Sequence, residues 1–325
     1  MDRTIRAIII IICALLLIGG LLEVFHPDYG YRSEFSLDDG SISYSLSSFA
    51  PAEYNILFTD NHGKESVEAL YIYYDEGYGS SFPDYGSVVE QMESRFSDRG
   101  MRTSRADSSV LKEILASSTS KVGIVMGAGT IPEESAQDLL AWIQNGGTVY
   151  WTYDVMGQYL SRSDGTYYTA ETSMQADFLG SQCTVMERVP AVSKDMSTGY
   201  TQVLGMKNRE MLGSLDLSLI EVPYLSFGYQ IDNRSEVVLL QCGSGTVCVI
   251  SGDHSMYQIT DIVQVACAGL TERSELKSFA VQHTDVLHST SGSSGFTLDA
   301  GTEYVVYSYV SGLNPPYGRT ARFVL

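Results

Sequence analysis

Positive charge is scarce in this sequence, which has 20 lysine and arginine residues against 39 aspartate and glutamate residues and a formal net charge of −19. A surface with this excess of negative charge repels the phosphate backbone of nucleic acids. We therefore expect no nucleic-acid partner. The simplest role of the charge is to keep the exposed surface soluble.

Several catalytic and cofactor-binding motifs are missing as well. The sequence contains no P-loop, no Gly-x-Ser-x-Gly nucleophile elbow and no His-Glu-x-x-His zinc motif. Gly127-Ala128-Gly129 precedes an expected helix, but Pro132 takes the place of the third glycine of the dinucleotide-binding pattern. The sequence therefore predicts no cofactor and no bound metal.

Cysteine is infrequent, with five residues, of which Cys13 lies in an apolar N-terminal run. The spacing of the others is not Cys-x-x-Cys, which disfavours zinc. Cys242 and Cys248 flank a glycine-rich turn between two strand-like runs, where they would face each other across a hairpin. A disulfide between them and free buried thiols are the two alternatives. Asn233 begins a lone glycosylation sequon, Asn-Arg-Ser.

Only one long hydrophobic run occurs, at residues 7–22. As a helix these sixteen residues rise about 24 Å, close to the roughly 30 Å thickness of the hydrocarbon core of a bilayer. Arg3 and Arg6 precede the run and Glu23 follows it, so the positive-inside rule places the N-terminus in the cytoplasm. These features predict a single-pass protein of the cell membrane, anchored in the bilayer by residues 7–22 with an extracytoplasmic C-terminal domain. A cleaved secretory signal is the alternative.

The remaining sequence predicts an α/β domain flanked by two β regions. The clearest α/β unit is a strand at 121–126, a capping box from Thr130 to Glu133 that opens a helix, and a strand at 148–153. Repetition of strand and helix predicts βαβ units and a mostly parallel sheet with right-handed crossovers. A hairpin turn is expected at Asp38-Asp39-Gly40. The predicted segments are 1–26 (cytoplasmic tip and transmembrane helix), 27–66 (β hairpin region), 67–278 (α/β domain, with an irregular insertion at 155–235) and 279–325 (β region that packs with 27–66 as an accessory β layer).

Four segments of the α/β domain carry a resemblance to a known family. Tyr73-Tyr74-Asp75-Glu76-Gly77 ends the first strand in an acidic turn, and 121–129 looks like a central strand with its loop. Residues 138–149 look like a helix that ends in Gly-Gly before a strand, and 243–253 like a late hairpin that closes in Gly-Asp. In this order they resemble the class I glutamine amidotransferase-like (flavodoxin-like) domain, most closely its non-catalytic DUF4350 and ThuA-like members. The resemblance implies a mostly parallel, flavodoxin-like sheet with helices on both faces.

The resemblance implies a domain that has lost its catalytic residues. Active members carry a cysteine on a tight elbow after the central strand, and a histidine and a glutamate near the last strand. This chain has Gly127, Ala128, Gly129 and Thr130 at the elbow, without the nucleophile that such chemistry needs. The loop is then expected to be a ligand cleft, and Thr130 a helix cap.

Side chains able to act as acids, bases or metal ligands follow several of the expected strands. Because ligands of open α/β sheets bind outside the carboxyl ends of the strands, these side chains would gather at one edge. They could hold a divalent cation or transfer protons, although aspartate also commonly caps helices and turns. The candidates are Asp75, Glu76, Asp154, Asp253 and His254.

Tyrosine is abundant, with 22 residues. Exposed tyrosine rings could bind carbohydrate. Tyrosine is also well suited to strands that are half buried, and we favour this structural explanation.

The leading functional hypothesis is a membrane-anchored, extracytoplasmic binding or scaffolding protein with membrane-associated protein partners. The alternative is a metal-dependent hydrolase or a related enzyme that uses carboxylates at the strand ends.

Overall fold

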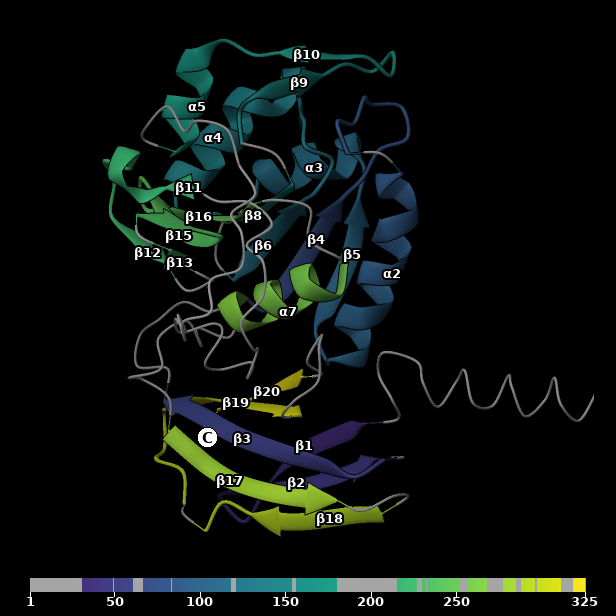
Figure 1. Cartoon of the computed structure of the whole chain (residues 1–325), viewed down its shortest axis with the longest axis vertical. Coiled ribbons are helices and arrows are strands. Elements are labelled where there is room, and N and C mark those ends of the chain that lie inside the picture. The colour runs from purple at the N-terminus through teal and green to yellow at the C-terminus, as the bar shows by residue number, and fades with distance from the viewer. Residues whose placement is uncertain are drawn as a thin grey trace, which may run out of the picture. The chain divides into compact units, whose positions relative to one another are not determined.

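The computed structural model of this chain groups its contacts into two compact units, each of which is described by itself (Figure 1). Unit 1 comprises Met1–Phe58 and Lys277–Leu325, and unit 2 comprises Thr59–Leu276. The structure describes residues 31–48, 50–60, 67–82, 84–117, 121–153, 156–179, 215–226, 230–231, 233–251, 256–267, 277–284, 288–295, 297–310 and 318–324.

Unit 2 is built on a seven-stranded sheet with the strand order β12-β15-β16-β8-β6-β4-β5. Five neighbouring strands are parallel: β4 (Ala69–Tyr73), β5 (Arg102–Ala106), β6 (Val122–Met126), β8 (Thr148–Tyr153) and β16 (Gly245–Ser251). Two antiparallel strands, β15 (Val237–Cys242) and β12 (Tyr224–Ser226), complete one edge.

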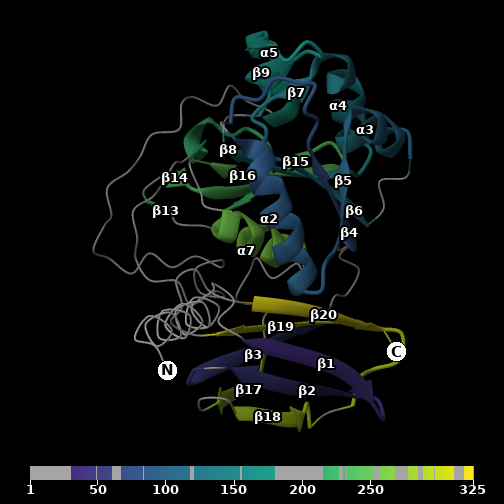
Figure 2. The ribbon, with the colours of Figure 1, turned by 90° about the vertical axis from the view of Figure 1, so that its right-hand side faces the viewer.

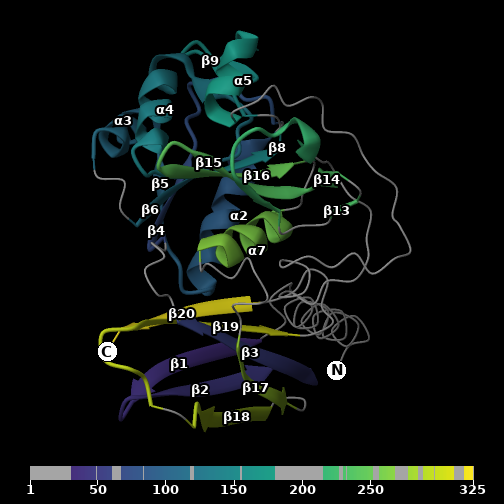
Figure 3. The same cartoon turned by 90° about the vertical axis from the view of Figure 1, so that its left-hand side faces the viewer.

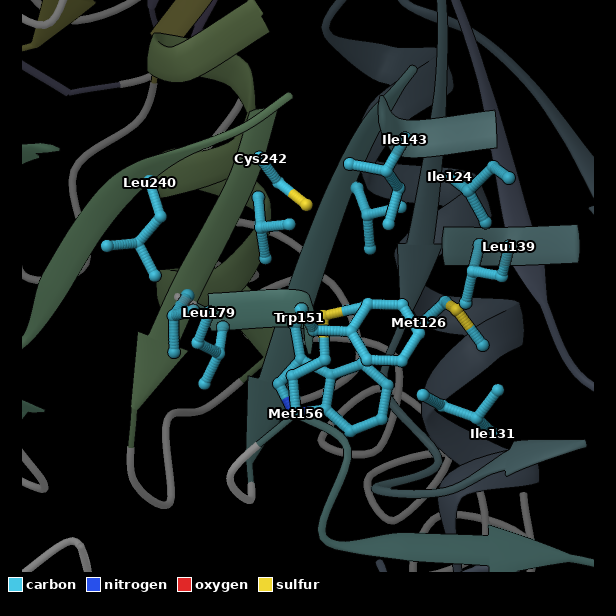
Figure 4. Close-up of a cluster of buried hydrophobic side chains, with 14 of the residues drawn as sticks. Ile124, Met126, Ile131, Leu139, Ile143, Trp151, Met156, Leu179, Leu240 and Cys242 are labelled. Carbon is cyan, nitrogen blue, oxygen red and sulfur yellow. The ribbon is translucent and has the colours of Figure 1, made fainter. Parts of the chain in front are cut away.

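Helices cover both faces of this sheet, which explains why its central strands are apolar on both sides. Figures 2 and 3 show α2 (Tyr85–Asp98) and α7 (Met256–Cys267) on one face, and α3 (Ser108–Leu115), α4 (Ala136–Gln144) and α5 (Thr172–Leu179) on the other. Trp151 of β8, Met126 of β6 and Leu139 of α4 belong to one cluster of buried apolar side chains (Figure 4). The neighbouring Tyr150 points the other way, since its hydroxyl lies 3.0 Å from Sγ of Cys267 in α7.

Two small sheets and two short 3-10 helices complete the described part of unit 2. One sheet has the order β10-β9-β7, and the other has the order β11-β14-β13. Their elements are β7 (Ile131–Pro132), η1 (Glu133–Ser135), β9 (Tyr159–Ser161), β10 (Tyr167–Thr169), β11 (Leu215–Asp216), η2 (Leu217–Leu219), β13 (Gln230–Ile231) and β14 (Arg234–Ser235).

Unit 1 consists of two sheets that share one apolar core. The first contains β1 (Arg32–Asp38), β2 (Ser41–Ser48) and β18 (His288–Ser293), and the second contains β17 (Lys277–Thr284), β3 (Ala52–Asp60), β19 (Glu303–Val310) and β20 (Gly318–Val324). Ile42 and Leu46 of the first sheet pack with Ile56 and Val306 of the second. The predicted hairpin turn is confirmed, because Asp38 pairs with Ser41 across it.

The predicted fold class is wrong for the chain as a whole. The chain is mixed α/β, its sheets are mostly antiparallel, and its largest sheet is a mixed sheet of seven strands. The reason lies in the connections: β15 and β16 are joined by Gly243 and Ser244 alone, and a link of two residues permits only an antiparallel pair. Parallel pairing is retained where helices connect the strands.

The predicted transmembrane helix and the localisation also need correction. Among the described residues, no helix is long and apolar enough to cross a bilayer, and the segment 7–22 lies outside these residues. The described part of the chain therefore gives no support to a single-pass membrane anchor.

Of the two alternatives for Cys242 and Cys248, the structure has the free thiols and not the disulfide, since both residues are free and buried. In the β15–β16 hairpin, Cys242 pairs with Gly245, whereas Cys248 pairs with Leu239. Paired residues point to the same face and neighbours along a strand point to opposite faces. The two sulfur atoms therefore lie on opposite sides of the sheet, where no disulfide can join them.

Candidate functional site

The candidate site lies at the carboxyl ends of β4 and β6. In chain order the five parallel strands are β4, β5, β6, β8 and β16, whereas in the sheet they are ordered β5-β4-β6-β8-β16. The chain thus reverses its direction of progress across the sheet between β4 and β6. Open α/β sheets bind ligands outside the carboxyl ends of the strands at such a reversal.

The ring of Tyr85 fills the space in front of the elbow at Gly127. Tyr85 is the first residue of α2, is only 2% exposed, and packs edge-on against Tyr74 and Phe82 at ring-centroid distances of 6.1 and 5.8 Å. A Cβ atom on Gly127 would overlap this ring. Glycine is therefore required at position 127 by a close approach. The place where a nucleophilic side chain would project is occupied by the chain itself.

The loop at residues 79–82 closes the rest of the predicted ligand cleft. The backbone N–H of Ser81 donates to the carbonyl oxygen of Ala128 at 2.9 Å, and the hydroxyl of Ser80 donates to the same oxygen at 2.8 Å. The hydroxyl of Thr130 donates to the carbonyl oxygen of Gly79 at 2.7 Å. The segment from Gly127 to Thr130 is thus hydrogen-bonded to this loop at two of its four residues.

Thr130 does not cap a helix, so the predicted capping box is wrong. Pro132 lies in β7, where it pairs with Ser161, and the chain enters η1 at Glu133 and α4 at Ala136. Neither η1 nor α4 has a side-chain hydrogen bond at its N-cap. Strand pairing with a distant segment has replaced the local cap.

Asp75 has a structural role at the start of α3. Its carboxylate accepts the backbone N–H of Ser108 at 3.0 Å and that of Gly77 at 2.9 Å. Burial alone would raise the pKa of Asp75, but these hydrogen bonds and one from the Ser108 hydroxyl together lower it. The carboxylate is ionised at neutral pH, and both of its oxygens accept hydrogen bonds from the backbone.

We expect Asp75→Ala to lower the free energy of unfolding by about 1–2 kcal/mol at pH 7, because backbone donors at the start of α3 lose their acceptor. The pKa of Asp75 is lowered in the folded state, so its contribution is present above the unfolded-state value of about 3.9 and is lost as the pH falls. Urea unfolding at several pH values measures this, and the curves of wild type and variant should converge in acid. A variant as stable as wild type at pH 7 would exclude the structural role.

Of the other predicted catalytic residues, only Glu76 lies in the part of the chain that the structure describes. Glu76 is exposed in the turn that follows Asp75. Asp154, Asp253 and His254 lie outside the residues that the structure describes. Within those residues, no group of three or more histidine, cysteine, aspartate or glutamate side chains is arranged to hold a metal ion.

A polar cluster that joins Tyr78, in the turn after β4, to Glu134 and Lys112 escaped the sequence analysis. The hydroxyl of Tyr78 donates to Oε1 of Glu134, and Nζ of Lys112 lies 3.6 Å from the same oxygen. The hydrogen bond to Glu134 raises the pKa of Tyr78, so this phenol stays protonated at neutral pH. The only local signal was the glycine-rich loop around Tyr78, which does not indicate a partner 56 residues further along the chain.

One hollow of about 270 Å³ lies between α3 and α4. Lys112 and Ser117 line it on one side, and Asp138, Trp142 and Asn145 line it on the other. This hollow lies between helices that cover the sheet and not at the strand ends. Its place is therefore distinct from that of catalytic crevices in open α/β sheets.

The predicted glycosylation site lies in the turn between β13 and β14, where Asn233 is exposed. The hydroxyl of Ser235, which completes the sequon, is buried and donates to the carbonyl oxygen of Val237 at 3.1 Å. Modification of Asn233 stays a prediction.

No family model and no curated protein matches this chain. Among solved structures, a catalytic mutant of a GH42 beta-galactosidase from G. stearothermophilus is 16% identical, with a TM-score of 0.42, over 75% of this chain and 34% of the galactosidase. A beta-galactosidase from Bacillus circulans sp. alkalophilus is 12% identical, with a TM-score of 0.40, over 77% of this chain and 36% of that one. The chain therefore spans about a third of the length of these galactosidases.

A ThuA-like protein from Bacteroides uniformis ATCC 8492 is also a structural neighbour. It is 12% identical, with a TM-score of 0.38, over 62% of this chain and 91% of that protein.

Proposed function

We propose that this chain is a ligand- or partner-binding or scaffolding protein, and that its α/β unit is a catalytically degenerate amidotransferase-like domain of the ThuA-like kind. The observation that carries the proposal is the ring of Tyr85, which occupies the space in front of Gly127. An enzyme of this architecture needs that space for a nucleophile and for the substrate atom that the nucleophile attacks.

The polar groups at the carboxyl ends of β4 and β6 support the same proposal. The carboxylate of Asp75 accepts two backbone N–H groups, and the carbonyl oxygen of Ala128 accepts hydrogen bonds from Ser80 and Ser81. A general base has to be within hydrogen-bond reach of the proton that it removes, with a pKa near the working pH. Asp75 has a lowered pKa and is already bonded to the backbone, so it is poorly suited to that task.

The proposal is tested by measuring bound metal and turnover in the purified full-length chain. We expect no stoichiometric divalent cation by elemental analysis and no release of ammonia from glutamine. A screen of small metabolites by thermal unfolding should identify compounds that raise the Tm, because a ligand that binds only the folded state stabilises it by mass action. These compounds should be recovered unchanged.

The opposite result would favour the metal-dependent hydrolase. A stoichiometric cation, or turnover of any stabilising compound, that is lost in Asp75→Asn would overturn the binding function. Glu76→Gln is the matched control, because Glu76 is the neighbouring carboxylate and is exposed in the turn.

A further inference from the structure

Two tyrosine side chains stand out by their exposure. Tyr167 of β10 is 47% exposed and Tyr224 of β12 is 46% exposed, whereas tyrosines such as Tyr54, Tyr150 and Tyr307 are fully buried in their sheets. Burial of the latter agrees with the structural explanation of the tyrosine content. Tyr167 and Tyr224 differ from each other in their surroundings.

Tyr167 belongs to one face of the β10-β9-β7 sheet. Tyr167 pairs with Ser161 and Thr169 pairs with Tyr159, so these four side chains share one face. The alternate residues of the two strands point to the opposite face and pack on the core of unit 2. We call Tyr159, Ser161, Tyr167 and Thr169 the tyrosine face.

The tyrosine face combines two aromatic rings with uncharged polar groups. The rings of Tyr159 and Tyr167 lie 5.5 Å apart at an interplanar angle of 78°. The side-chain amide of Gln158 donates to the hydroxyl of Tyr159 at 2.9 Å. The hydroxyl of Ser161 is fully buried on this face, and within the described part of the chain it has no hydrogen-bond partner. A buried hydroxyl without a partner favours the arrival of an additional polar group.

Contacts of Arg162, on the opposite side of the sheet from the tyrosine face, hold this hairpin in place. The guanidinium of Arg162 lies 4.4 Å from the ring centroid of Tyr168 and is bonded to Glu133 at 2.9 Å. The tip of the hairpin lies against the loop at residues 79–82, since a Cβ atom on Gly79 would be 2.5 Å from the carbonyl oxygen of Thr166. A fixed platform loses little conformational entropy when it binds a ligand.

We propose that the tyrosine face binds a neutral saccharide, and this inference rests on the proposed binding function. A sugar ring presents C–H groups on its flat side and hydroxyls around its rim. The negative faces of aromatic rings attract such C–H groups, and hydroxyl and amide groups can pair with the rim. The tyrosine face carries no charged side chain and the chain has a net charge of −19, so an uncharged ligand fits better than an anionic one.

The test uses a printed array of neutral oligosaccharides, probed with the full-length chain. Wild type should bind at least one glycan, and its affinity for that glycan should fall at least about tenfold in Tyr167→Ala, since the exposed ring is lost. Tyr167→Phe keeps the ring and should stay within about threefold of wild type. Tyr224→Ala is the matched control, because it removes an equally exposed tyrosine outside this face and should leave binding unchanged.

Three results would overturn the saccharide site. They are the absence of binding to every neutral glycan, glycan binding that survives Tyr167→Ala, and an equal loss in Tyr224→Ala. None of these would contradict the broader binding function, which is decided separately by the metal and turnover measurements.

Discussion

Replacement of Asp261 by alanine is expected to lower the free energy of unfolding by about 3–5 kcal/mol. Asp261 of α7 is 1% exposed, and its Oδ1 atom lies 2.5 Å from a guanidinium nitrogen of Arg99 and 3.9 Å from one of Arg95, both in α2. Both arginines are buried as well. Removal of the carboxylate leaves two buried positive charges without this negative charge between them, and such charges are far more costly to bury than a complete ion pair.

Urea unfolding at neutral pH measures the effect of Asp261→Ala. Glu113→Ala in α3 is the control, because Glu113 is exposed and its replacement should change stability by no more than about 0.5 kcal/mol. Added salt should reduce the difference only slightly, since buried charges are weakly screened. A loss below about 1 kcal/mol for Asp261→Ala would show that this carboxylate does not hold α2 and α7 together.

Replacement of Tyr85 by alanine should lower the free energy of unfolding by about 3–5 kcal/mol, the usual range for loss of a large buried aromatic side chain. The ring of Tyr85 packs against Gly127, Tyr74 and Phe82, and without it a cavity would open at the carboxyl ends of β4 and β6. Thermal or urea unfolding measures the loss.

Tyr85→Phe is the matched variant that separates the ring from its hydroxyl. Burial raises the pKa of Tyr85, and a hydrogen bond with the backbone of Gly127 offsets only part of this rise, so the hydroxyl is protonated at neutral pH. Its removal should cost no more than about 1 kcal/mol, because one hydrogen bond is lost while the ring stays in place. A loss above about 1 kcal/mol in Tyr85→Phe would assign the hydroxyl a role that a space-filling ring does not have.

A double-mutant cycle ties the ring to the glycine that faces it. Gly127→Ala alone should cost about 1–3 kcal/mol, because the added methyl group overlaps the ring of Tyr85. The same change should cost less in a Tyr85→Ala background, where the space is free. Equal costs in both backgrounds would contradict the close approach of the two residues.

The strands of the parallel sheet and the hairpins could be predicted from the sequence because their signals are local. Apolar runs marked β4, β6 and β8, and Asp39 with Gly40 supplied the positive φ angles that a tight hairpin turn requires. The helix cap at Thr130 was mispredicted because its hydroxyl is bonded to Gly79, which is 51 residues away. Tertiary pairing of this kind leaves no trace in a short window of sequence.

For the candidate site, the position of the residues could be predicted from the sequence, but their roles could not. Its place at the end of β4 could be predicted, and Asp75 does lie there. Two features could not be predicted, the hydrogen bond from Asp75 to the first turn of α3 and the packing of Tyr85 against Gly127, since both depend on contacts between separate elements. An aspartate after a strand is compatible with catalysis and with capping, and only the positions of its donors decide between them.

The ion pairs of Arg95 and Arg99 with Asp261 join two helices, α2 and α7, that are synthesised far apart in time. Thr260 accepts a hydrogen bond from Arg99, a residue that the ribosome adds 161 residues earlier. At a synthesis rate of about 5–20 residues per second, Arg95 and Arg99 remain without Asp261 for about 10–30 s. Positive charges are well solvated by water, so α2 can wait with this side exposed, whereas an apolar side would invite aggregation during the delay. The buried charges thus suit a domain whose last helix arrives long after the helix that it covers.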